Sequence, residues 1–231
     1  MKLSGKVLKD IKKAFNNLEK QYPNIDIIED GILDIQQYEN ASPRILWLLK
    51  QDYYDSGCTE KDYASRIRES VENKQDGGPT WRNMSYVTYM LLHNVSWTTV
   101  PCDSLSSLLK TAVIEINKEP SETSTSPDDV ILEGFSRFRN ILFQQIDAYS
   151  PEIVIFVGGN GLFSIFSELS MRYAGHPYDP AKSIHIEKGD TVFFRCKDCT
   201  FIWAYHPSYL GISSQDYCEG IVEAYQASLK S

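Results

Sequence analysis

The chain has 231 residues, of which 42% are hydrophobic and 23% charged, the balance of a folded globular protein. Lys and Arg number 23 against 31 Asp and Glu, so the formal net charge is −8. This excess of acid argues against a protein that coats nucleic acid through its overall charge, but it leaves room for a local polar groove. The chain is long enough to bury a stable core without a disulfide or a bound metal. Its five scattered cysteines favour a reducing, cytoplasmic location.

The first 40 residues are predicted to form a helical extension. Between Met1 and Tyr22, apolar side chains recur at helical spacing with Lys and Asn on the other face, which predicts an amphipathic helix packed on a core. This segment lacks the continuous apolar stretch of a signal peptide. The longest apolar runs of the chain are far shorter than the ~20 residues that cross a bilayer. We therefore expect no membrane partner.

The remaining residues, 41–231, alternate short apolar runs with stretches of helical period. Strands separated by helices imply crossover connections and a mainly parallel sheet. The segment 190–205 differs, because two apolar runs flank the short CKDC sequence and predict a hairpin. The whole chain is thus predicted to be one α/β domain. Its four main strands are expected at Arg44–Leu49, Ala112–Ile116, Ile153–Val157 and Phe201–Tyr205.

Chemically useful residues follow each of these strands. In open α/β sheets, ligands bind beyond the carboxyl ends of the strands, so these residues are expected to meet at one edge. A carboxylate such as Asp52 can orient or deprotonate a water molecule. The amide of Asn117 offers both a donor and an acceptor, and Glu115 shares its strand parity. Pro207 restricts His206 to an extended conformation at its strand end.

Each of these residues also has a plain structural interpretation. Asp52 suits a turn, His206 suits a hydrogen-bonded structural position, and Glu115 suits a solvated sheet edge. The turn Gly158-Gly159-Asn160 allows close backbone approach to a ligand but lacks the spacing of a dinucleotide fingerprint. Cys196 and Cys199 form a lone CxxC pair without a second pair to complete a zinc site. We therefore expect no metal and no cofactor.

Three segments of the chain, and the order in which they occur along it, resemble the uracil-DNA glycosylase superfamily. The sequence RILWLLKQDYYDSG at 44–57 is similar to its first motif, a strand that leads into a loop with a water-positioning acid. IWAYHPSYLG at 202–211 resembles its second motif, and PEIVIFVGGNGLFSIF at 151–166 resembles its third strand, glycine turn and following helix. The resemblance implies a three-layer α/β/α fold with a central, mostly parallel four-stranded sheet. It also implies a monofunctional enzyme that hydrolyses the N-glycosidic bond of uracil or another deaminated base in DNA.

The resemblance also implies roles for individual residues. Asp52 would orient the attacking water, and His206 would stabilise negative charge on the departing base. Tyr53 or Tyr54 would form a wall of the base pocket, and Asn117 or Glu115 would read the edge of the base. DNA, single- or double-stranded, would be contacted by the loop residues Gly158, Gly159, Asn160, Ser208, Tyr209 and Leu210.

Some features depart from the family pattern. Lys50 stands where members of the family usually place a glycine that lets the backbone approach the base. The segment from Tyr209 to Gly220 contains no Lys or Arg. These departures support an alternative, a catalytically inactive relative that binds a nucleobase, a nucleotide or a protein. A third alternative is an unrelated α/β domain in which Asp52 and His206 do not share an edge.

Overall fold

The computed structural model describes residues 3, 5–53, 63–73, 77–123, 125–181 and 183–230. Its longer helices are α1 (Gly5–Gln21), α2 (Ile35–Asn40), α3 (Tyr63–Glu72), α4 (Gly78–His93), α5 (Asp128–Tyr149), α6 (Phe163–Ala174) and α7 (Ser214–Ser228). Short 3₁₀ turns are η1 (Trp97–Thr99), η2 (Ser104–Lys110), η3 (Asn160–Leu162) and η4 (Lys188–Asp190). The strands are β1 (Gly31–Ile32), β2 (Ile45–Tyr53), β3 (Thr111–Ser121), β4 (Ile153–Val157), β5 (His185–Ile186), β6 (Thr191–Cys196) and β7 (Cys199–Ala204).

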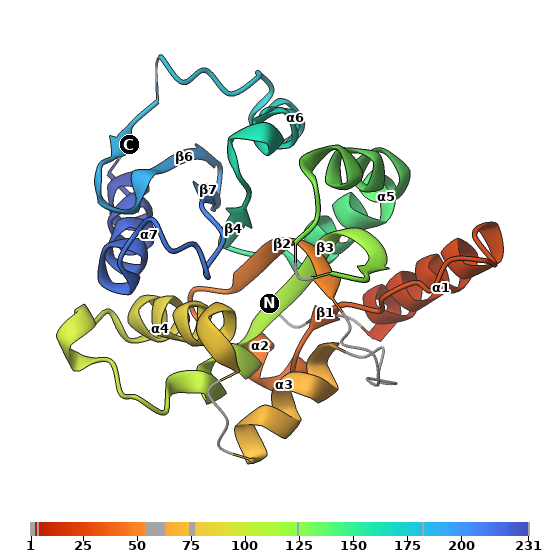
Figure 1. Ribbon diagram of the computed structural model, residues 1–231, viewed down its shortest axis with the longest axis horizontal. Coiled ribbons are helices and arrows are strands. Elements are labelled where there is room, and N and C mark those ends of the chain that lie inside the picture. The colour runs from red at the N-terminus through yellow and green to blue at the C-terminus, as the bar shows by residue number, and fades with distance from the viewer. Residues whose placement is uncertain are drawn as a thin grey trace.

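The described strands form a seven-stranded sheet in the order β1-β3-β2-β4-β7-β6-β5 (Figure 1). Four of them, β3, β2, β4 and β7, are parallel neighbours and correspond to the four predicted strands. The expectation of a four-stranded sheet was too narrow, because three antiparallel strands extend this parallel core at its two edges. The predicted hairpin is confirmed as β6–β7, in which Cys196 lies opposite Cys199.

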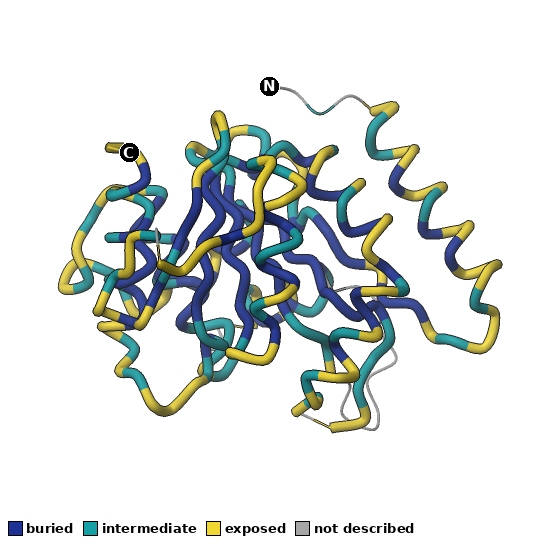
Figure 2. The backbone as a smooth tube through the Cα atoms, turned by 90° about the horizontal axis from the view of Figure 1, so that it is seen from above, coloured by how far each residue is buried: buried dark blue, intermediate teal, exposed yellow. Residues whose placement is uncertain are grey.

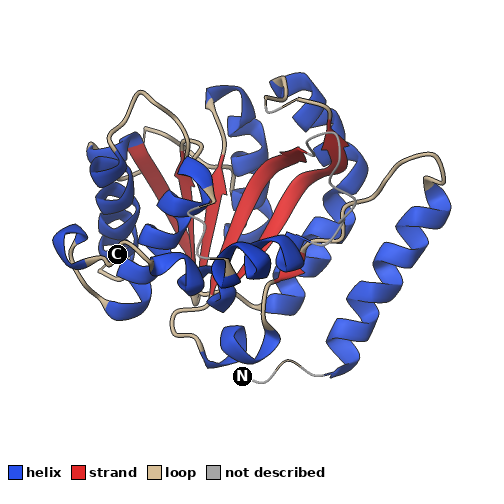
Figure 3. Ribbon diagram, turned by 60° about the horizontal axis from the view of Figure 1, so that its bottom comes forward, coloured by secondary structure: helices blue, strands red, loops and turns tan. Residues whose placement is uncertain are grey.

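Helices cover both faces of the sheet, which gives three layers (Figure 3). On β2, alternate residues point to opposite faces, and all of Ile45 to Leu49 are buried. Leu46 and Leu48 belong to the core under α1, α5 and α6. Ile45 and Trp47 belong to the core under α3, α4 and α7. An apolar strand buried on both faces therefore accounts for the unbroken run that the sequence shows at this point.

The amphipathic helix predicted near the N-terminus is α1. It buries Ile11, Phe15 and Leu18 against the domain, and its outward face is exposed (Figure 2). The first 40 residues also contain β1, which pairs with β3 and so joins the sheet. Within the described ranges, no helix is both long and apolar enough to cross a membrane.

The chain reverses its direction across the sheet between β2 and β4. From β2 it passes to β3 on one side, whereas from β4 it passes to β7 on the other side. In open α/β sheets, ligands bind at the carboxyl ends of the strands on either side of such a reversal. We refer to this edge of the sheet, at the ends of β2, β4 and β7, as the crevice. This topological switch point lies between the end of β2, near Asp52, and the glycine turn after β4.

Candidate functional site

Lys50 lies at the switch point. From β2, its Nζ reaches Oδ1 of Asp128, in the first turn of α5, at 3.1 Å. It also passes the turn after β4, since a Cβ added to Gly159 would lie 3.7 Å from the same Nζ. The Lys50 side chain is 23% exposed and that of Asp128 is 41% exposed. The ion pair therefore lies at the switch point and remains accessible to solvent.

His206 follows β7 and is held in one orientation by its own loop. Its Nδ1 accepts a hydrogen bond from the backbone N–H of Ser208 at 3.3 Å and lies 2.8 Å from the hydroxyl oxygen of the same residue. Asn83 of α4 donates to the carbonyl of Pro207 at 2.6 Å and fixes the loop from below. Because Nδ1 is an acceptor, these bonds assign the ring proton to Nε2, which is left as a donor.

The charge state of His206 follows from its surroundings. Burial, assisted by the positive charge of Lys50, lowers the pKa of His206 to about 4. The imidazole is therefore neutral at pH 7, and its Nε2–H can donate to an oxygen on which negative charge develops.

Exposed apolar side chains stand beside His206. The rings of Tyr205 and Tyr209 stack with centroids 4.7 Å apart and an interplanar angle of 16°. Tyr209 is 48% exposed, and Leu210 at the tip of the turn is 96% exposed. An aromatic platform with a projecting leucine suits stacking on a flat ligand or filling a gap in a stack of bases.

Asp52 is engaged by an arginine that the sequence analysis did not single out. Its Oδ2 forms an ion pair with the guanidinium of Arg66 on α3, and its Oδ1 accepts from the Tyr53 N–H at 2.9 Å. Both side chains of the pair are largely enclosed, at 12% exposed for Asp52 and 15% for Arg66. β4 separates β2 from β7, so the strands that carry Asp52 and His206 lie about 10 Å apart, two strand spacings.

The two candidates for reading a base are both buried. Asn117 packs against Gly134 of α5, and its Oδ1 accepts from the N–H of Glu119 at 3.2 Å. Glu115 is 1% exposed, and within the described residues its Oε2 has no hydrogen-bond partner. Burial, with a smaller contribution from Asp30, raises the pKa of Glu115 to about 8, so this carboxyl group is protonated at neutral pH. In this structure neither side chain reaches the solvent of the crevice.

Lys118 lies two residues beyond the predicted strand Ala112–Ile116. In the structure β3 continues to Ser121, and the Lys118 side chain is fully buried. Its Nζ lies 2.8 and 2.6 Å from the two carboxylate oxygens of Asp30 and 2.9 Å from Oε1 of Gln145. This lysine therefore contributes to the core and not to the surface charge of the crevice.

The structure thus gathers some of the predicted site residues and leaves others apart. Asp52 and His206 share the carboxyl edge of the sheet, as do the glycine turn and the loop of Ser208, Tyr209 and Leu210. Tyr53 is 40% exposed at the end of β2, whereas Tyr54 lies outside the described residues. A Cβ on Gly158 would press into the ring of Phe156, so this turn requires glycine for close packing.

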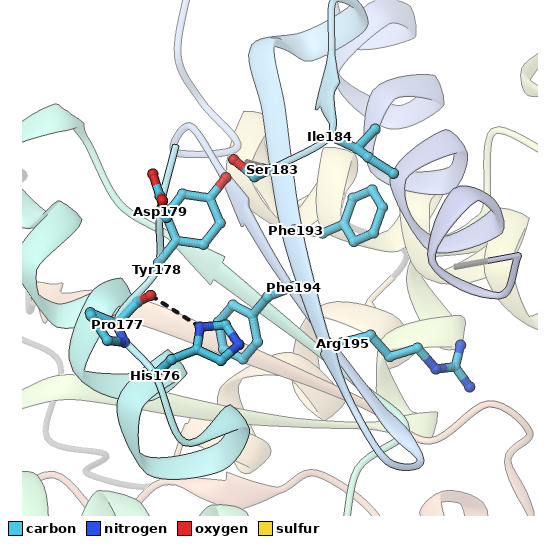
Figure 4. Close-up of a pocket in the computed structure, with 9 residues that line it drawn as sticks. All are labelled: His176, Pro177, Tyr178, Asp179, Ser183, Ile184, Phe193, Phe194 and Arg195. Atoms are coloured by element: carbon cyan, nitrogen blue, oxygen red, sulfur yellow. Dashed lines mark hydrogen bonds between the residues drawn. The ribbon is translucent and has the colours of Figure 1, made fainter. Parts of the chain in front are cut away.

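A separate cavity of about 570 Å³ lies between the segment 176–184 and β6 (Figure 4). Its lining includes the aromatic side chains of Tyr178, Phe193 and Phe194, and the Arg195 side chain is directed away from the other labelled residues. None of the predicted site residues lines it. Among the described residues, no group of three His, Cys, Asp or Glu side chains is arranged to hold a metal ion. The sequence matches no protein-family model and no curated protein.

Proposed function

We propose that the crevice at the carboxyl ends of β2, β4 and β7 binds a nucleobase, and that the chain is a uracil-DNA glycosylase-like hydrolase. Its reaction would be hydrolysis of the N-glycosidic bond of uracil or a related deaminated base in DNA. The observation that carries the proposal is the neutral His206, whose Nε2–H is available as a donor at this edge. The parallel strand order β3-β2-β4-β7 supports the finer resemblance in fold.

The residues of the crevice have distinct parts in this reaction. As the glycosidic bond breaks, its electron pair moves onto the base, and the His206 Nε2–H stabilises the negative charge that develops on a base oxygen. The ammonium group of Lys50 favours the same charge from the β2 side. The Asp52 carboxylate, held by Arg66, orients the water that attacks C1′ of the sugar. Tyr209 and Leu210 are exposed beside a base that must leave the stack to be reached.

Release of uracil from single- and double-stranded DNA, measured at several salt concentrations, tests this function. We expect His206→Ala to lower the rate of excision by about 100-fold or more, the usual loss for one such donor. His176→Ala is the matched control, because His176 also precedes a proline but is exposed in a loop away from the crevice. Release no faster than that of an Asp52→Ala, His206→Ala double variant would contradict the proposal.

A second candidate is binding without turnover. Two observations favour it. The Asp52 carboxylate, which would activate the water, is already paired with Arg66, and Asn117, which would read the base, is buried. This candidate predicts saturable binding of a free base or a nucleotide with no product formed. Excision that depends on His206 would rule it out.

A further inference from the structure

Lys50 places a primary amine in the crevice, and the proposed hydrolysis uses only its positive charge and not its capacity as a nucleophile. The amine lies among three elements that form the site. It pairs with Asp128 of α5, it borders Gly159 of the turn after β4, and its charge lowers the pKa of His206 beyond β7. With 23% of its side chain exposed, Lys50 is held in place and still open to a ligand.

The ion pair of Lys50 with Asp128 contributes little to the stability of the fold. A partly exposed pair of this kind contributes about 0–1 kcal/mol to stability. Lys50 directly follows five buried apolar residues of β2, at the position where the strand leaves the core and enters the crevice. The glycines at 159 and 161 leave room around it, since a side chain at 161 would collide with the Asp128 carboxylate.

We propose that Lys50 is the nucleophile of a second activity, cleavage of DNA at an abasic deoxyribose by β-elimination. The inference rests on the proposed function for its choice of DNA, because an abasic sugar is the product of base excision. That sugar opens to an aldehyde at C1′, and lysine amines form Schiff bases with carbonyl groups.

The steps balance without an oxidant or a reductant. Asp128, 3.1 Å away, accepts a proton from the ammonium group, and the amine lone pair then forms a bond to C1′ as the aldehyde π bond opens onto its oxygen. That oxygen takes one proton from the nitrogen and one back from Asp128 and leaves as water, which gives a protonated imine. The imine withdraws electrons as a proton passes from C2′ to water, and the C3′–O bond breaks with its electron pair on the departing 3′ phosphate. Hydrolysis of the imine returns the Lys50 amine.

Trapping with borohydride tests the proposal on the full chain. The probe is duplex DNA with one preformed abasic site, so the result does not depend on base excision. We expect a covalent protein–DNA adduct, mapped to Lys50 by mass spectrometry, and strand cleavage when borohydride is omitted. Lys50→Arg keeps a cation opposite Asp128 and yet should reduce both signals to the level without protein. Asp128→Asn should slow adduct formation.

The matched control is Lys9→Ala, which removes an exposed lysine on α1 and should leave the adduct unchanged. An adduct of equal yield in Lys50→Arg, an adduct mapped to another lysine, or no adduct with the parent chain overturns the inference. Uracil release that persists while no adduct forms would contradict this second activity alone. An adduct without uracil release would instead contradict only the glycosylase proposal.

Discussion

Two Lys–Asp pairs in this molecule share their chemistry and differ in their surroundings. Lys118 and Asp30 have fully buried side chains, and Gln145 donates to Asp30 and accepts from Lys118. Lys50 and Asp128 make one contact at the mouth of the crevice, and both are partly exposed. Removing one partner of a buried pair leaves a charge without compensation, whereas water replaces the partner of an exposed one. The Lys118–Asp30 pair thus stabilises the fold, whereas either partner of the Lys50–Asp128 pair can bind a ligand in place of the other.

The largest effect is expected from breaking the buried pair. Lys118→Met should lower the free energy of unfolding by about 3–5 kcal/mol, because the Asp30 carboxylate remains buried without its cation. Lys50→Met removes the same group from the crevice and should change the free energy of unfolding by no more than about 1 kcal/mol. Urea denaturation of both variants beside the parent chain measures the difference. Equal losses would show that the two pairs are not distinguished by burial.

An intermediate effect is expected from Glu115, which adjoins the buried pair. Its pKa rises from the model-compound value of 4.5 to about 8 on folding, so between these values the folded chain keeps a proton that the unfolded chain releases. Glu115 therefore makes the free energy of unfolding fall as pH rises through this window, by up to about 1.4 kcal/mol per pH unit. Below pH 6.5 the lowered pKa of His206 acts in the opposite direction, so the net fall is expected between pH 6.5 and about 8. Glu115→Gln should remove this slope.

Urea denaturation of the parent chain and of Glu115→Gln, between pH 6.5 and about pH 8, measures the slope that Glu115 imposes without the opposite contribution of His206. Glu19→Gln is the control, since Glu19 is exposed on α1 and its substitution should leave the pH dependence of the parent chain intact. A parent chain whose stability does not fall over this range would show that Glu115 ionises as freely when folded as when unfolded.

The smallest effect concerns the influence of Lys50 on His206. Burial is the larger cause of the lowered pKa of His206, and the charge of Lys50 is the smaller one. Lys50→Ala should therefore raise this pKa from about 4 but leave it below the ordinary value of 6.5. NMR titration of the imidazole protons follows the change, with Lys9→Ala as a variant that should leave it unaltered. A parent His206 that titrates near its ordinary value would contradict the neutral, buried imidazole.

Much of the fold follows from local sequence. Ile153–Val157 was predicted with the bounds that the structure gives β4, and the hairpin around the CKDC segment was also predicted. Both are apolar runs with clear boundaries. The two-residue strands β1 and β5 are too short to show a period, and they exist because neighbouring strands offer them hydrogen bonds.

The sequence predicted which strand ends meet at one edge of the sheet, but not the contacts that side chains make there. The strand ends that carry Asp52 and His206 follow from the order of strands and helices. The ion pair of Lys118 joins residues 88 positions apart, and no local pattern shows that a lysine near the end of a strand will turn inward to meet Asp30. Arg66 is likewise an ordinary helical arginine in the sequence, and only the packing of α3 brings it to Asp52.

The place of β4 has a consequence for how such a crevice changes over evolution. β4 is hydrogen-bonded to both β2 and β7, so the distance between β2 and β7, the two sides of the crevice, is fixed by backbone geometry and not by any side chain. Substitutions at positions such as 50, 52 and 206 change the side chains on each side of the crevice, while the distance between β2 and β7 stays constant. New chemistry can therefore arise by exchange of single residues, but a ligand of a different width can be admitted only through the loops above.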